Sequence, residues 1–230
     1  MLFVHGWQAD ASVWNALIAE LGEQTHSLAL DLRGSGASDA APGPYCLERY
    51  AADLRDLLAA RDAAPAIVVG HSMGATAALR LAVDAPQAVR ALVLVAPVPA
   101  SGGGYSAKGE AFLRATAGDP VAARNWLSRT FHAAPDPQVL DRLCAAAETT
   151  SRDVALESFD SWAFADFAAA TQSVTAPALV IAPEYDAPEN VREKVAALLP
   201  NARFEILPDC GHYAVLERPA EIAALVRAFL

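Results

Sequence analysis

The chain has 230 residues, of which 54% are hydrophobic and 19% charged, and its formal net charge at pH 7 is −10. That length and composition are typical of a globular protein with one domain, or with one domain that carries an insertion. The acidic balance disfavours the basic surface with which proteins bind nucleic acids or anionic membranes, so we expect neither partner.

Cysteine and histidine usage gives no sign of a metal site or a disulfide framework. The three cysteines are widely spaced, at positions 46, 144 and 210, and no Cys-x-x-Cys or His-Glu-x-x-His pattern occurs. No apolar run approaches the length that crosses a membrane. We therefore expect reduced thiols, a cytoplasmic location and no metal.

Short apolar runs alternate with helical patterns over the first 97 residues and again from residue 173. The predicted strands are 2–4, 27–30, 67–69, 91–95, 178–181 and 203–207, and the predicted helices are 12–21, 47–58, 73–83, 189–199 and 219–229. Ser12 is a candidate N-cap for the first of these helices. Apolar strands separated by helices form parallel sheets covered on both faces. The sequence therefore predicts a three-layer α/β fold with a parallel sheet of about six strands.

The alternation stops between residues 98 and 172. The pattern there is helical, contains no strand and is rich in aromatic side chains. We interpret this stretch as a helical lid inserted between two strands of the sheet. Residues 1–97 and 173–230 would then form the core.

The strand at 67–69 leads into Gly70-His71-Ser72-Met73-Gly74, and an alanine-rich helical pattern follows at once. Strand, sharp turn and helix are the context of a nucleophile elbow, which projects a serine hydroxyl from the end of a sheet. Glycines on either side let two backbones approach more closely than a Cβ permits. Ser72 is the predicted nucleophile, and the alternative is a small-residue turn that only packs the helix on the strand.

A serine nucleophile needs a general base and an acid that orients the base. In a parallel sheet these groups come from loops at the carboxyl ends of strands. Asp186 follows the strand that ends at residue 181, and His212 follows the strand that ends at residue 207. We predict Asp186 as the acid, with helix capping as its alternative role and Glu184 as the nearest substitute. We predict His212 as the base, and the alternative is a surface histidine in a turn, with no catalytic role.

An acyl-transfer site also needs two N–H donors near the developing negative charge. Met73, the residue after the nucleophile, supplies one backbone N–H, and Trp7, in the loop after the first strand, supplies the other. Their side chains are then free to line the pocket. We expect structural roles for His5, in the oxyanion loop, and for His71, beside the nucleophile.

Together these residues resemble the α/β-hydrolase superfamily, in its lid-bearing serine esterase and lactonase branch. The motifs that carry the resemblance are His5-Gly6-Trp7, the segment 31–38, Gly70 to Gly74, Asp186, Gly211-His212 and Glu217-Arg218-Pro219. The chain order of serine, aspartate and histidine is also the order of that superfamily. The resemblance implies hydrolysis of an ester or related acyl bond through an acyl-serine intermediate, with no cofactor.

The chain departs from the superfamily pattern in two ways. An antiparallel hairpin usually precedes the first strand, whereas here Met1 already lies in that strand. We therefore expect the strand at 27–30 to lie exposed at one edge of the sheet, where it favours a homodimer. The second departure is Pro183, where glycine is common. This proline affects the geometry of the loop that carries Asp186.

The lid indicates the kind of substrate. Trp126 and Trp162 are the lid residues that we expect to contact it, through its apolar part. The lid has six basic and nine acidic side chains, which disfavours an acidic carrier protein as the partner. We expect a free small-molecule ester or lactone, held between lid and sheet.

Other functions fit the same residues. The same triad serves hydrolysis of a carbon–carbon bond and perhydrolysis, and no residue separates these reactions from ester hydrolysis. The fold also serves ligand receptors with slow turnover, in which the lid moves to recruit a partner. The leading hypothesis is a serine hydrolase of small esters or lactones.

Overall fold

A parallel sheet forms the centre of the protein. The structure is a computed structural model, which describes residues 1–186, 194–195, 199 and 202–230. In their order across the sheet, the six strands are β2 (Leu28–Leu30), β1 (Leu2–Val4), β3 (Ala66–His71), β4 (Val89–Val95), β5 (Ala178–Pro183) and β6 (Arg203–Leu207). All five pairings between neighbours are parallel. The prediction of about six parallel strands, with the strand at 27–30 on an edge, is confirmed. Pairing of that edge in a homodimer stays a prediction.

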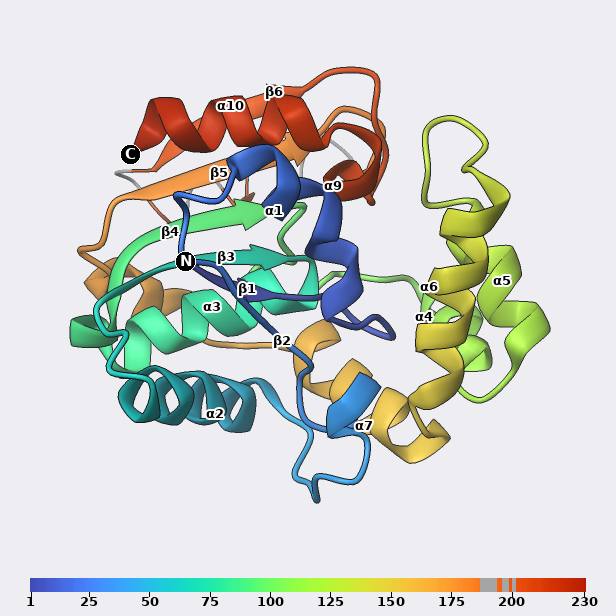
Figure 1. The fold of residues 1–230 in the computed structure, drawn as a ribbon. Helices are drawn as coiled ribbons and strands as arrows, with labels where there is room; N and C mark the ends of the chain where they lie inside the picture. The colour runs from blue at the N-terminus through green and yellow to red at the C-terminus, as the bar shows by residue number, and fades with distance from the viewer. Residues whose placement is uncertain (187–193, 196–198, 200–201) are drawn as a thin grey trace.

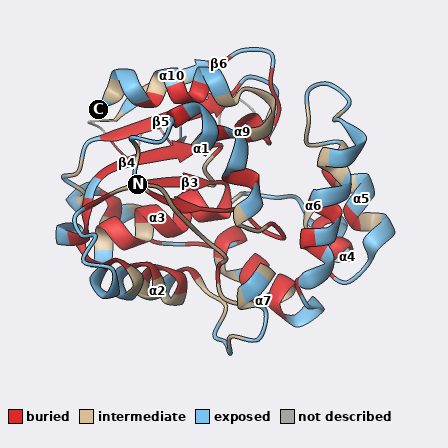
Figure 2. Ribbon diagram, viewed as in Figure 1, coloured by how far each residue is buried: buried red, intermediate tan, exposed pale blue. Residues whose placement is uncertain are grey.

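Helices cover both faces of the sheet (Figure 1). The principal ones are α1 (Asn15–Leu21), α2 (Leu47–Ala60), α3 (Met73–Asp84) and α10 (Pro219–Phe229). Successive strand residues point to opposite faces, so Phe3 and Val69 pack with α1 and α10, while Leu2 and Val68 pack with α2 and α3. Figure 2 shows the result, a buried sheet between helices whose outer faces are exposed. This is the predicted three-layer architecture.

The segment between β4 and β5 is helical. It contains α4 (Ala107–Thr116), α5 (Pro120–Ser128), α6 (Pro137–Thr149), α7 (Arg152–Ala163) and a 3-10 helix (Ala168–Ser173). Figure 1 shows α4, α5 and α6 beyond the carboxyl ends of the strands. The helical content of this segment agrees with the sequence pattern, and its role as a lid stays a prediction. The exact boundaries of the lid, at residues 98 and 172, stay predictions.

Some helices differ from the prediction in detail. The first begins as a 3-10 turn (Ala11–Trp14), and its N-cap is Asp10, whose carboxylate accepts a hydrogen bond from the N–H of Ser12. Ser12 itself is therefore not the cap. A short helix, α9 (Ala214–Glu217), precedes α10 and was not predicted. The helix predicted at 189–199 lies outside the described residues for most of its length.

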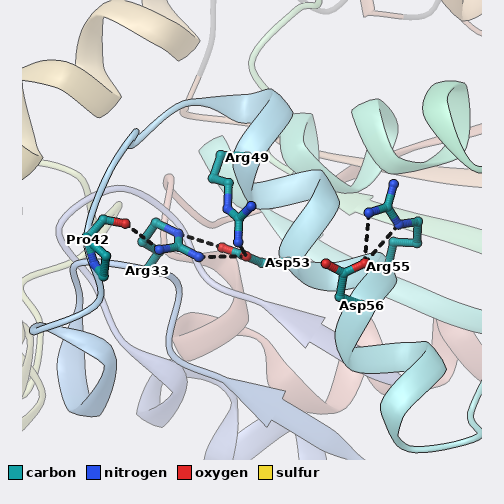
Figure 3. Close-up of polar contacts among 6 residues, drawn as sticks. All are labelled: Arg33, Pro42, Arg49, Asp53, Arg55 and Asp56. Carbon is teal, nitrogen blue, oxygen red and sulfur yellow. Dashed lines mark hydrogen bonds and ion pairs between the residues drawn. The ribbon is translucent and has the colours of Figure 1, made fainter.

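The loop after β2 is fastened to α2 by ion pairs, shown in Figure 3. The guanidinium of Arg33 donates two hydrogen bonds of 2.8 Å to the carboxylate of Asp53, and Arg49 forms an ion pair with the same carboxylate at 2.8 Å. A bidentate contact between arginine and a carboxylate fixes the relative orientation of the two side chains and also stabilises the pair. The pair Arg55–Asp56 on the same helix is exposed and contributes little. The loop after β2 is thus held against α2.

Candidate active site

Ser72 lies in a sharp turn between β3 and α3. Its backbone has φ +55° and ψ −124°, a strained conformation for a residue with a side chain. A Cβ on Gly70 would lie 2.5 Å from the Cα of Ala75, and one on Gly74 would lie 2.2 Å from the carbonyl oxygen of His5. Both contacts are with backbone, which explains why glycines stand at these two positions. The turn has the geometry that the sequence predicts.

Asp186 and His212 meet at the carboxyl end of the sheet. Oδ1 of Asp186 lies 2.9 Å from Nδ1 of His212, and only 19% of each side chain is exposed. Burial by itself lowers the pKa of His212, but the charge and hydrogen bond of Asp186 outweigh it and raise the pKa above its ordinary value. Pro183 therefore does not keep Asp186 out of hydrogen-bond distance of His212. Glu184, the substitute acid, instead accepts a hydrogen bond from the N–H of Asp209.

Ser72, Asp186 and His212 line one cavity of about 530 Å³. Trp7, Trp126 and Trp162 line it as well, so both lid tryptophans are at the expected place. The Ser72 hydroxyl makes no hydrogen bond to another residue in the described part of the chain. Hydrogen bonds of a catalytic serine often tighten only when substrate is bound.

The loop after β1 is held by His5. Nε2 of this buried ring accepts a hydrogen bond of 2.9 Å from the N–H of Leu32, so the ring proton is on Nδ1 and is donated to the carbonyl of Gly6 at 2.8 Å. Burial lowers the pKa of His5. The ring is a neutral link between the loop after β1 and the loop after β2. The expectation of a structural role is confirmed.

The two residues expected to donate to the oxyanion differ in where their side chains lie. Neither the backbone N–H of Trp7 nor that of Met73 has an acceptor among the described residues. The Trp7 side chain lines the cavity, and its indole N–H donates to the carbonyl of Ala155 in α7 at 2.9 Å. The Met73 side chain instead packs into the core between sheet and helices. Of the two side chains that are free to line the pocket, only that of Trp7 belongs to a residue of the cavity wall.

An aromatic cluster connects the core to the lid. The Trp7 ring lies 5.3 Å from the ring of Trp126 and 5.7 Å from that of Trp162, both edge-on, and 5.5 Å from that of Phe159. Such contacts stabilise by about 0.5–1.5 kcal/mol each beyond the apolar area they bury. Its three tryptophans line the cavity, and the cluster packs α7 against the loop after β1.

His71 is not a second base. It is fully buried, and this burial, with a smaller effect from His212, lowers its pKa to about 3. The neutral ring donates from Nε2 to the carbonyl oxygen of His212 at 2.8 Å. His71 therefore has the structural role expected of it.

Several lining residues were not predicted. They come from the lid and from the loop after β5, and include Tyr105, Arg129, Thr130 and Tyr185. One signal for Tyr105 was available, since it follows β4 at the carboxyl edge of the sheet, where ligand-contacting loops lie. Within the described residues, no group of three or more metal-ligating side chains occurs, and no helix has the length and apolar character needed to cross a membrane.

A model of the alpha/beta hydrolase family matches residues 1–225, and the chain belongs to that family. The lipase LipV of Mycobacterium tuberculosis is 32% identical over 100% of this chain and 92% of its own length. A second protein of that organism is 37% identical over 95 residues only, which are 41% of this chain and 28% of that protein. The enol-lactonase of Burkholderia xenovorans is 25% identical, with a TM-score of 0.88 over 99% of this chain and 89% of that one. A hydrolase of Pseudomonas aeruginosa is 27% identical, with a TM-score of 0.86 over 99% and 88% of the two chains.

Proposed function

We propose that this protein is a serine hydrolase that cleaves small carboxylic esters or lactones. The observation that carries the proposal is the hydrogen bond between Asp186 and His212, inside the cavity that also contains Ser72 at its strained turn. A carboxylate on Nδ1 of the ring keeps a proton there and leaves Nε2 as the base. Similarity to a lipase and to an enol-lactonase supports the same chemistry.

In the proposed reaction, Oγ of Ser72 attacks the substrate carbonyl while Nε2 of His212 accepts the hydroxyl proton. The backbone N–H groups of Trp7 and Met73 stabilise the oxyanion that forms. His212 then protonates the leaving alkoxide, which departs as an alcohol and leaves an acyl-serine. The same nitrogen deprotonates a water molecule, which releases the acid and restores the serine. These steps need no cofactor.

The size and lining of the cavity favour a free small molecule as the substrate. A volume of about 530 Å³ is within the range of small-molecule sites. We propose that Trp126 and Trp162 contact the apolar part of the substrate. The three cysteines are free thiols, in keeping with a reducing compartment, and we retain the cytoplasm as the proposed location.

The test replaces Ser72 by alanine and measures turnover of p-nitrophenyl acetate and butyrate. Removing a serine nucleophile lowers kcat by at least about 10,000-fold, and we expect a loss of that size. The matched control is Ser106→Ala, since Ser106 lines the same cavity but its hydroxyl caps α4. Ester turnover that survives in Ser72→Ala would refute the proposal. Diketones and a perhydrolysis assay on the wild type test the two alternative reactions.

A further inference from the structure

The loop that carries His212 is held from two sides. The N–H of His212 donates to the carbonyl of Thr130, in the lid, at 2.7 Å. On the other side, the carbonyl of His212 accepts the hydrogen bond from His71, at the elbow. The imidazole therefore takes its position from the lid as well as from the core of the protein.

The carboxylate of Glu217 bridges the same two segments. Oε1 accepts a hydrogen bond of 2.8 Å from the N–H of Gly211, and Oε2 accepts one of 3.0 Å from the N–H of His132. Each oxygen serves one backbone donor. A carboxamide at this position would offer one acceptor and turn an NH₂ group toward the second donor. The bridge thus requires a carboxylate.

Lid and loop are also in close contact at this point. We call residues 130–132 the lid clasp. A Cβ on Gly211 would lie 2.4 Å from the carbonyl oxygen of Thr130, so only glycine fits under the clasp. The rings of Phe131 and Tyr213 stack at 5.4 Å with an angle of 14° between their planes.

The lid clasp also contacts the loop that carries Asp186. The ring of His132 stacks on that of Tyr185 at 4.0 Å and 17°, and Tyr185 is the neighbour of Asp186. In Figure 1 the connection between α5 and α6 lies on the side of the lid that faces α9. The clasp therefore contacts the loops of both members of the acid–base pair.

We propose that Glu217 is a positioning residue for His212, and that it acts by tying the histidine loop to the lid clasp. The inference rests on the proposed function, because it concerns the base of that reaction. A displacement of about 1 Å in a reacting group costs about 100-fold in rate. Loosening the clasp therefore lowers the rate of acylation while the cavity still binds substrate.

The test compares Glu217→Gln with Glu221→Gln. Glu221 is a carboxylate four residues further on, in α10, which pairs with Arg218 at 3.9 Å. We expect Glu217→Gln to lower kcat for p-nitrophenyl butyrate about 10- to 100-fold, with KM within about twofold of the wild type. Glu221→Gln should resemble the wild type. Because Asp186 and burial set the pKa of His212, the pH midpoint of kcat/KM should not move in either variant.

A second measurement does not depend on turnover. In NMR spectra of the wild type, the Nδ1 proton that His212 shares with Asp186 should give a downfield signal, and the amides of Gly211 and His132 should exchange slowly. In Glu217→Gln we expect that signal to broaden and both amides to exchange faster.

The outcomes separate the inference from the proposed function. A wild type without Ser72-dependent turnover would refute the function, and the NMR comparison would then decide the inference. A Glu217→Gln protein with wild-type kcat would overturn the inference. So would one whose amides exchange faster while the His212 signal is unchanged, because Glu217 would then stabilise the lid without positioning the base.

Discussion

Replacing Asp186 by asparagine tests how the site makes a base of His212. The 2.9 Å bond between Oδ1 and Nδ1 is formed by side chains that are only 19% exposed, so water does not readily replace it. An asparagine amide can donate to Nδ1, which moves the ring proton to Nε2 and removes the lone pair with which the proposed base accepts a proton. The same change in the triad of a serine protease lowers kcat about 10,000-fold, which corresponds to about 5 kcal/mol in the barrier. We expect a loss of this order.

The pH profile gives the substitution a second readout. His212 acts as a base only when neutral, and Asp186 raises its pKa. In the wild type, kcat/KM should therefore fall as pH drops, with a midpoint above the ordinary histidine value of about 6.5. In Asp186→Asn the remaining activity should have its midpoint at lower pH.

Glu184→Gln is the matched control for Asp186→Asn, because Glu184 lies two residues away and bonds to the N–H of Asp209 instead. We expect it to retain activity within a few-fold. Equal losses in the two variants, or an unchanged profile in Asp186→Asn, would refute the assigned roles.

Two further predictions concern residues that pack around the site, and a third concerns the edge of the sheet. In Gly74→Ala the new methyl group meets the carbonyl of His5, and we expect about 1–3 kcal/mol less stability in denaturant unfolding; an unchanged midpoint would contradict this. In His71→Phe a buried aromatic ring remains, somewhat larger than imidazole, but the N–H to the His212 carbonyl is lost. Stability should therefore fall by about 1–3 kcal/mol and kcat about tenfold; wild-type kcat would mean that this bond does not position the loop. Pairing through the edge strand β2 predicts a dimer in light scattering, and a monomer at working concentration would exclude it.

The elbow was predictable because backbone segments close in sequence pack too tightly there for a Cβ. Gly70 meets the backbone of Ala75, only five residues away, and the pattern of strand, turn and helix lies in one continuous stretch. The meeting of Asp186 and His212 was predictable for a topological reason, since parallel strands deliver their following loops to one edge of the sheet. The choice between Asp186 and Glu184 could not be made from spacing alone.

Contacts made by the lid were not predictable. The bond between His132 and Glu217 joins residues 85 positions apart, and that between Trp7 and Ala155 joins residues 148 apart. Both depend on how the helices of the lid pack on the core. Glu217 was noted only as part of a family motif, because no sequence pattern shows that both of its oxygens accept backbone N–H groups.

Labelling with a fluorophosphonate, followed by mass spectrometry of the modified peptide, tests the central proposal most directly. The reagent reacts with a serine only where a base activates it and the cavity is accessible. We predict one modified residue, Ser72, with labelling lost in Ser72→Ala and strongly slowed in His212→Ala. Modification of another residue, or none in the folded protein, would contradict the account.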